Sequence, residues 1–309
     1  MGLFFIQRIG HILITALGVV TLTFFLIHLT PGDPIEVLLG EHALAADRTA
    51  LREALGLHLP IWEQYTTFIR NLFNADLGTS LYTGKEVTSM IISRLPATVK
   101  LAVSAMIFAV TLGIFLGVIA AAYKNKFADK FTLFFSMIGF SMPSFWLGPL
   151  LIIVFSLWLG WFPISGESGF SGMVLPSITL GLGMAAFTGR LTRNTLLETL
   201  SQDYIRTAQA KGCSPTRVLL RHALPNALLP VVTVVFLQVG ALLTGAIITE
   251  AVFSWPGVGS LIVDSLQRRD YPVIQGCVLF ISCVYMGMTL LSDITYALLD
   301  PRIRYGDKS

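Results

Sequence analysis

The sequence predicts an all-α membrane protein with six transmembrane helices, and three observations support this fold class. Hydrophobic residues make up 54% of the 309 residues and charged residues only 13%, against ~25% charged in soluble domains. Several apolar runs are long enough to cross a hydrocarbon core of ~30 Å as a helix. Lys and Arg gather in some of the short segments between these runs, which is typical of loops on the cytoplasmic side.

The predicted spans are the six apolar runs Ile9–Gly32, Leu101–Tyr123, Phe131–Leu157, Met173–Gly189, Ala227–Thr249 and Pro272–Leu291. Lys124, Lys126 and Lys130 follow the second run, and Arg190 and Arg193 follow the fourth. The positive-inside rule places these loops in the cytoplasm. Six spans with this sidedness put both the N terminus and the C terminus in the cytoplasm.

The chain is predicted to divide into four segments. Residues 1–32 hold the N-terminal tail and the first span, and residues 33–98 form a mixed, polar extracytoplasmic segment. Residues 99–299 hold the other five spans, and residues 300–309 form a basic cytoplasmic tail. The first boundary lies at Pro31–Pro34, because two prolines and a glycine cannot continue a helix.

Within the extracytoplasmic segment we expect short helices over Ala45–Leu55, Ile61–Phe73 and Val87–Leu95. Gly56 should stop the first of these helices and Pro96 the third. Pro143 lies in the middle of the third membrane span and should kink it. A second outer loop is predicted from Glu250 to Tyr271, after the fifth span.

A polar stretch between the fourth and fifth spans, Asp203–Pro225, has a helical but half-polar pattern and should lie outside the bilayer. Gly212 is expected to end one helix, because glycine readily adopts the left-handed conformation. Ser214 should cap the next helix, with Pro215 in its first turn. The stretch therefore predicts a helix–turn–helix, the 203–225 element, whose small apolar face needs another surface to dock against.

The 203–225 element resembles the EAA loop in membrane subunits of ABC importers, which reads Glu-Ala-Ala, three residues, Gly, nine residues and Ile-x-Leu-Pro. Arg206-Thr207-Ala208 stand at the Glu-Ala-Ala positions before Gly212, and Leu224-Pro225 stand on the closing Leu-Pro. Arg206 for glutamate, Thr207 for alanine and His222 for isoleucine are departures that resemble the peptide/nickel branch of that family. Pieces similar to peptide permeases extend this resemblance to nearly the whole chain: Asp76–Ser80, Phe253–Gly259 and Arg269–Pro272.

The resemblance implies the type I ABC importer permease fold and a role as a non-catalytic permease subunit for di- or oligopeptides in the bacterial cytoplasmic (inner) membrane. The implied partners are a second homologous permease subunit, two P-loop ATPase subunits, an extracytoplasmic substrate-binding protein and the lipid bilayer. The ATPase subunits would bind ATP and Mg²⁺, so no cofactor, metal site or catalytic residue is expected in this chain.

The residues that the resemblance implies for coupling to the ATPase subunits are Asp203, Tyr204, Ile205, Arg206, Thr207, Ala208, Ala210, Lys211, Gly212, Leu224 and Pro225. Within the element, we expect Ile205, Ala208 and Leu219 to be the apolar anchors in a groove of an ATPase subunit. The Asp33–Leu95 and Trp255–Tyr271 segments are candidate docking surfaces for the binding protein.

Alternatives within the family are a nickel or metal-chelate permease and a glutathione permease. A secondary transporter driven by an ion gradient is disfavoured, because the second to fifth spans lack an interior acid. Gly84-Lys85 does not make a P-loop, since Thr79 stands where glycine is needed and Glu86 where Ser or Thr is needed. The net charge of +3 is too small and dispersed to favour nucleic-acid binding. The scattered histidines form no metal-binding pattern: His11, His28, His42, His58 and His222.

Overall fold

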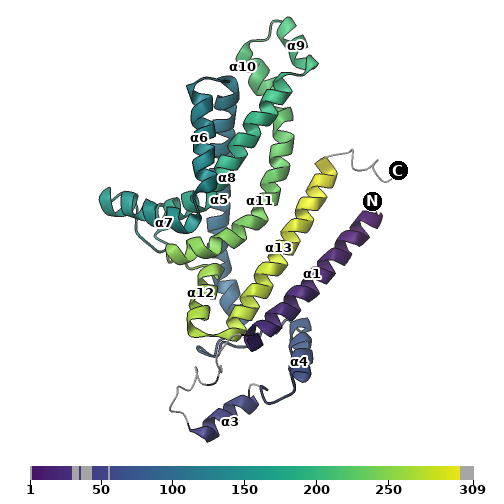
Figure 1. Cartoon of the computed structure of the whole chain (residues 1–309), viewed down its shortest axis with the longest axis vertical. Helices are drawn as coiled ribbons and strands as arrows, with labels where there is room; N and C mark the ends of the chain where they lie inside the picture. Colours follow the sequence, from purple (N-terminus) through teal and green to yellow (C-terminus); the bar gives the residue numbers. More distant parts are fainter. Residues whose placement is uncertain (1, 30–34, 36–43, 55, 300–309) are drawn as a thin grey trace. The chain divides into compact units, whose positions relative to one another are not determined.

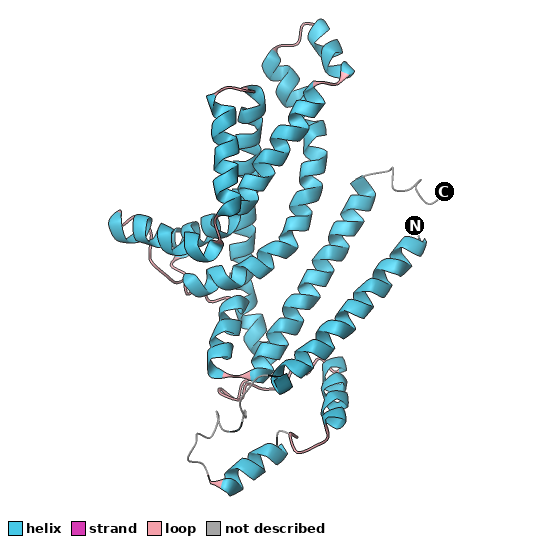
Figure 2. Ribbon diagram, in the orientation of Figure 1, coloured by secondary structure: helices cyan, strands magenta, loops and turns pink. Residues whose placement is uncertain are grey.

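The computed structural model describes residues 2–29, 35, 44–54 and 56–299. The predicted break at Pro31–Pro34 and the predicted tail at 300–309 lie outside these residues. Within them the named elements are all helical (Figures 1 and 2), and Thr79 and Glu86 form an isolated antiparallel bridge. The helices are α1 Gly2–Leu29, α3 Ala45–Ala54, α4 Ile61–Phe73, α5 Val87–Ala122, α6 Phe127–Ser141, α7 Ser144–Leu151, α8 Gly169–Leu200, α9 Asp203–Ala210, α10 Pro215–Arg217, α11 Leu224–Val252, α12 Val258–Arg268 and α13 Tyr271–Leu299, with π-helical stretches η1 Ile152–Trp158 and η2 Val218–Ala223.

Four of the described helices are long and apolar enough to cross a membrane: Val87–Ala122, Gly169–Leu200, Pro215–Gly240 and Tyr271–Leu291. A fifth candidate is the pair Phe127–Ser141 and Ser144–Trp158, whose two halves are bent by 107°. The first predicted span contains a shorter apolar helix, Gly10–Phe25. These long apolar helices indicate an integral membrane protein. A helix is suited to the bilayer because it pairs its own backbone N–H and C=O groups where no water is present.

The residues form two compact units. Unit 1 comprises Met1–Pro96 and Gly257–Met286, and unit 2 comprises Ala97–Pro256 and Gly287–Ser309. In unit 1, α1 pairs with α13, since Gln275 Nε2 donates to the carbonyl of Thr23 at 3.0 Å. The same part of α1 holds α4, whose Tyr65 hydroxyl lies 2.9 Å from Thr21 Oγ1 and whose ring meets Phe24 edge-on.

In unit 2, α8 packs against α6 and α11, and the three helices lie side by side in Figure 1. Helix α5 crosses α8 through small residues. A Cβ atom on Gly117 would lie 2.6 Å from the carbonyl oxygen of Gly189, and one on Gly113 would lie 2.7 Å from Cβ of Thr188. Glycines at this spacing let two helix backbones come into contact. Such close packing drives helix association in lipid, where the hydrophobic effect does not favour one helix over the lipid tails.

The predicted helix boundary at Pro96 is wrong, whereas the predicted kink at Pro143 is confirmed. Helix α5 runs through Pro96 from Val87 to Ala122, so the short outer helix and the second span are one helix. A proline removes one helical hydrogen bond, and a long apolar helix tolerates that loss when its other bonds form. The kink at Pro143 is a complete break: Met142 before it is extended, with φ −82° and ψ 115°, and the helices on either side are bent by 107°. The steric clash of a proline ring with the preceding residue explains this break.

The predicted outer loop from Glu250 also begins too early, because α11 continues to Val252. Glu250 is fully buried in unit 2 and accepts a hydrogen bond from Thr98 Oγ1 at 2.7 Å. Trp255 is also fully buried, and its Nε1 donates to the carbonyl of Ala97 at 2.8 Å. These two contacts fasten the end of α11 and the residues after it to α5. The prediction that the second to fifth spans hold no interior acid therefore does not extend to the end of α11.

Candidate functional site

The 203–225 element follows α8 and begins with helix α9, Asp203–Ala210. Gly212 follows with a φ of +79°, the left-handed conformation that the sequence predicts. Its N–H donates to Gln209 O at 2.9 Å, and the N–H of Cys213 donates to Ala208 O at 3.2 Å. This pair of bonds is the Schellman motif, which satisfies carbonyls left free at a helix end.

The second half of the element begins at Ser214, whose Oγ accepts from the N–H of Arg217 at 3.4 Å, with Pro215 in the first turn. The cap is the predicted one. The helix that follows is not separate, since α10 passes through the π-helical stretch η2 directly into α11. The π-helical turn precedes Pro225, which has no N–H to give to the carbonyl four residues before it.

The apolar face of the element packs on its own chain. Ile205 is 0% exposed and Ala208 8% exposed, and they form one cluster with Ala121 of α5, Leu196 of α8 and Val218 of η2. Leu219 packs against the same cluster, partly buried. The expectation that Ile205 and Ala208 anchor the element in a partner's groove is therefore wrong, whereas the role expected of the partly buried Leu219 stays a prediction. The docking surface that the small apolar face needs is supplied by the ends of α5 and α8.

The outward face of the element is polar and exposed. It consists of Asp203, Tyr204, Arg206, Thr207, Ala210, Lys211 and Gly212. Tyr204 is held in place, because its hydroxyl accepts from Asn226 Nδ2 at 2.9 Å and donates to the carbonyl of His222 at 3.4 Å. Arg206 and Asp203 form an exposed ion pair at 3.6 Å. Of the two closing residues, Leu224 is partly buried and Pro225 is exposed at the start of α11.

A second candidate site lies in unit 1, where the segment from Asp76 to Glu86 meets α12. The Asp270 carboxylate, which is 4% exposed, accepts the Ser80 hydroxyl at 2.5 Å on one oxygen and the N–H of Leu81 at 3.0 Å on the other. The loop also closes on itself, with Ser80 N–H donating to Lys85 O at 2.8 Å. Two sequence pieces that each resemble peptide permeases are thus joined through one buried carboxylate.

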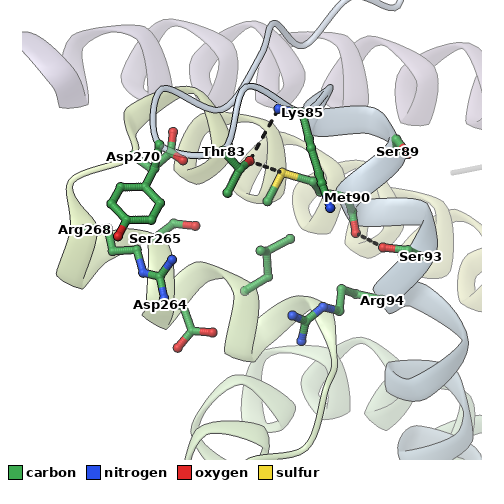
Figure 3. Close-up of a pocket in the computed structure, with 12 residues that line it drawn as sticks. Thr83, Lys85, Ser89, Met90, Ser93, Arg94, Asp264, Ser265, Arg268 and Asp270 are labelled. Carbon is green, nitrogen blue, oxygen red and sulfur yellow. Dashed lines mark hydrogen bonds between the residues drawn. The ribbon is translucent and has the colours of Figure 1, made fainter. Parts of the chain in front are cut away.

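This loop and α12 form one wall each of a pocket of about 410 Å³ (Figure 3). Cationic side chains line it: Lys85 from the loop, Arg94 from the first turns of α5 and Arg268 from α12. The Arg268 guanidinium lies 4.7 Å from the centre of the Tyr82 ring. The sequence did not predict this pocket, because Lys85 was considered only as part of a phosphate-binding loop. The charges at 85 and 94 lie so far along the sequence from those at 264 and 268 that no sequence pattern signals a shared site.

No group of three or more His, Cys, Asp or Glu side chains that could hold a metal ion occurs among the residues that the structure describes. The three cysteines are free thiols. Cys277 is buried and Cys283 exposed on the same helix, α13.

Two family models match the chain. Residues 113–305 match the binding-protein-dependent transport system inner membrane component, and residues 1–102 match the N-terminal component of the same transport systems. Together the two matches cover most of the chain, including the 203–225 element and both walls of the pocket in unit 1.

Curated relatives match over nearly their full length. The chain is 42% identical to the di/tripeptide transport system permease protein DppB of Pseudomonas aeruginosa, over 98% of each chain. It is 41% identical to the dipeptide transport system permease protein DppB of Escherichia coli K12, again over 98% of each. It is also 42% identical to the glutathione transport system permease protein GsiC of E. coli K12, over 97% of this chain and 98% of the relative.

Two solved structures share the fold. The inward-facing MetNI methionine ABC transporter matches with a TM-score of 0.56 at 18% identity, over 69% of this chain and 97% of that chain. An amino acid ABC transporter crystallised with histidines matches with a TM-score of 0.53 at 17% identity, over 70% of this chain and 94% of that one. At these identities the matches describe the fold and nothing finer.

Proposed function

The chain belongs to the family of binding-protein-dependent transport system inner membrane components, and we propose that it forms half of the translocation path for di- and oligopeptides in an ABC importer. The observation that carries this proposal is the near-complete match to two DppB proteins at 41–42% identity. Glutathione is a second candidate substrate, because the match to GsiC is equally high. Glutathione is itself a tripeptide, although its first peptide bond is made through the γ-carboxyl of glutamate, so both candidates are small peptides.

The proposal includes a topology of six spans with both termini in the cytoplasm of a bacterium and the chain in its inner membrane. It is supported by the four or five candidate spans and by the apolar helix in α1. The positive charges after the second and fourth predicted spans support the sidedness. In this arrangement the 203–225 element is cytoplasmic, and the loop from Asp76 to Glu86 with α12 is extracytoplasmic.

The 203–225 element is proposed to receive the motion of the ATPase subunits, which bind ATP and Mg²⁺ and hydrolyse the nucleotide. Its buried face makes it suitable for this task. Because Ile205 and Ala208 are packed between the ends of α5 and α8, a displacement of α9 moves those ends as well. Because η2 leads without a break into α11, the same displacement reaches α11. Contacts to the ATPase subunit come from the exposed residues around Tyr204, Arg206 and Thr207.

The remaining partners proposed are a second, homologous permease subunit and an extracytoplasmic substrate-binding protein. A purification of the tagged chain from its own membranes, followed by peptide mass spectrometry, tests the assembly. We expect two P-loop ATPases, a second permease and one binding protein to co-purify. A chain that purifies alone and still transports peptide in vesicles without ATP would overturn the proposal.

The coupling role has a sharper test in variants of the two faces of α9. Replacing Arg206 and Thr207 on the exposed face by Glu should release the ATPase subunits while the permease remains folded. Ile205→Ala should instead lower the stability of the permease, because it removes a fully buried side chain, at about 2–5 kcal/mol. Equal retention of the ATPase subunits by the exposed-face variant and the wild type would show that this face is not the contact surface.

A further inference from the structure

The pocket in unit 1 holds charges that are not used within the chain. Neither Lys85 Nζ nor the Arg94 guanidinium has an ion pair or hydrogen bond to another described side chain, and the same is true of the Asp264 carboxylate. Asp270, the other acid of the pocket, is occupied by Ser80 and Leu81. Three cations therefore face one free carboxylate, and the open space between them carries an excess of positive charge. Figure 3 shows Arg94 and Arg268 reaching into this space from opposite walls.

The walls of the pocket are fixed before any ligand arrives. Asp270 fastens the tip of the loop, Val87 N–H donates to Gly78 O at 3.0 Å at its base, and Thr83 N–H donates to Ser80 Oγ at 2.9 Å within it. Val87 is fully buried, and Gly276 of α13 lies so close that an added Cβ would be 2.4 Å from a Val87 methyl. A site whose charged groups stand on rigid supports loses little conformational freedom when a ligand binds.

We propose that this pocket receives a carboxylate side chain of the extracytoplasmic binding protein, seated between Lys85, Arg94 and Arg268. This inference rests on the proposed function, which places unit 1's loop and α12 outside the membrane. An acidic side chain is the complement that the charge excess selects, and the arginines are able to bind it with two hydrogen bonds each.

The exposure of the walls favours a protein over a free peptide. Lys85, Arg268 and Asp264 are all exposed, and the Tyr82 side chain is 65% exposed. A small ligand on such an open site stays largely in water, whereas binding sites for small molecules cover most of their ligand. A docked protein would cover the rim and exclude water, which strengthens the charge pairing inside. Tyr, Arg and Met, all present here, are residues enriched in protein interfaces.

The test measures the affinity of the binding protein identified by co-purification for the complete complex in lipid nanodiscs, at low and at physiological salt. Arg94→Glu and Arg268→Glu should each weaken binding roughly 10- to 100-fold, because an attraction becomes a repulsion. The wild-type affinity should fall as salt is added, and the variants should show less of this dependence. Arg190→Glu is the matched control, since Arg190 is an exposed residue of α8 outside the pocket and outside both candidate docking segments, and this variant should bind as the wild type does.

Two further experiments distinguish docking of the binding protein from binding of a small carboxylate. Acidic surface residues of the binding protein are changed to Lys one at a time, and one of these changes should restore affinity for the Arg94→Glu complex, which also shows that this variant is folded. Glycyl-glycine and glutamate are titrated into the complex without binding protein. If either binds the wild type and not Arg94→Glu, the site belongs to a small carboxylate and the proposal is overturned.

If the Arg94→Glu and Arg268→Glu complexes bind the binding protein as tightly as the wild-type complex does, the inference is also overturned, while the importer assignment stays intact. The importer assignment itself fails only if the wild-type complex contains no ATPase subunits or transports without ATP. The two failures are therefore distinct.

Discussion

Arg193 of α8 holds Asp129 at the start of α6 through both carboxylate oxygens. Its Nε lies 2.5 Å from Oδ1 and its Nη2 lies 2.9 Å from Oδ2, and the two side chains are only 15% and 3% exposed. The backbone N–H of Asn125 donates to the same carboxylate at 2.8 Å. This bidentate pair fixes the loop between α5 and α6 to the helix that leads into the 203–225 element.

Removing one partner of this pair should destabilise the protein strongly. Asp129→Ala leaves a largely buried guanidinium unpaired, which costs about 3–5 kcal/mol, and Arg193→Lys should also destabilise because lysine cannot bind both oxygens. Thermal unfolding of the purified complex, followed by size-exclusion chromatography in detergent, measures the loss. The double variant Asp129→Ala/Arg193→Ala should lose less than the sum of the single variants.

The exposed pair between Lys100 and Glu167, 2.7 Å apart with 59% and 33% of each side chain exposed, is the control. Lys100→Ala should change stability by less than about 1 kcal/mol, as solvent screens such pairs. If Lys100→Ala and Asp129→Ala are equally destabilising, burial does not explain the strength of the Asp129 pair.

The close crossing of α5 and α8 should not accept a side chain. Gly117→Ala places a methyl group 2.6 Å from the backbone oxygen of Gly189, and the helices must separate, at about 1–3 kcal/mol. Gly287→Ala is the matched control, because nothing lies within 4 Å of its added methyl group and alanine favours a helix by up to about 1 kcal/mol. Unfolding temperatures of the two variants in the same detergent should therefore move in opposite directions. A Gly117→Ala protein as stable as the wild type would show that the two helices are free to move apart.

The Asp270 carboxylate should control the order of the outer loop. Asp270→Ala leaves the Ser80 hydroxyl and the Leu81 N–H without their acceptor, at about 1–3 kcal/mol for each buried group, and the loop should open. Limited trypsin digestion should then cut after Lys85 faster than in the wild type. Asp264→Ala, which removes an exposed carboxylate of the preceding helix α12 with no described partner, should leave the cleavage rate unchanged. Equal rates in all three proteins would mean that other contacts hold the loop.

Gly212 should tolerate asparagine and reject proline. With a φ of +79° and nothing within 4 Å of an added Cβ, the position restricts the backbone rather than the side-chain volume. Asparagine adopts this conformation at small cost, whereas proline fixes φ near −65° and removes the N–H that binds Gln209. In proteoliposomes that contain the ATPase and binding-protein partners, Gly212→Asn should retain ATP-driven peptide uptake. Gly212→Pro should hydrolyse ATP without uptake, and normal uptake by this variant would remove the coupling role from the turn.

Local signals in the sequence predicted much of the helical structure. The helix Ile61–Phe73 has the bounds that its apolar spacing predicts, and Gly56 and Gly212 both adopt the left-handed conformation expected after a helix end. Ser214 and Pro215 begin the next helix as predicted. These features succeed because they depend on the backbone preferences of a few neighbouring residues. The role of the 203–225 element in coupling remains a prediction, since it concerns chains other than this one.

The sequence by itself determined that the protein is a helical membrane protein, because composition and apolar run length are properties of the chain alone. Tertiary structure decided what Pro96 and Pro143 do, since the effect of a proline depends on whether neighbouring contacts hold the helix together. It decided that Ile205 and Ala208 face inward, because the direction of a small apolar face depends on which surface is nearest. It also brought Lys85, Arg94 and Arg268 to one pocket, since charges far apart in the sequence become neighbours only when a buried group such as Asp270 joins their segments.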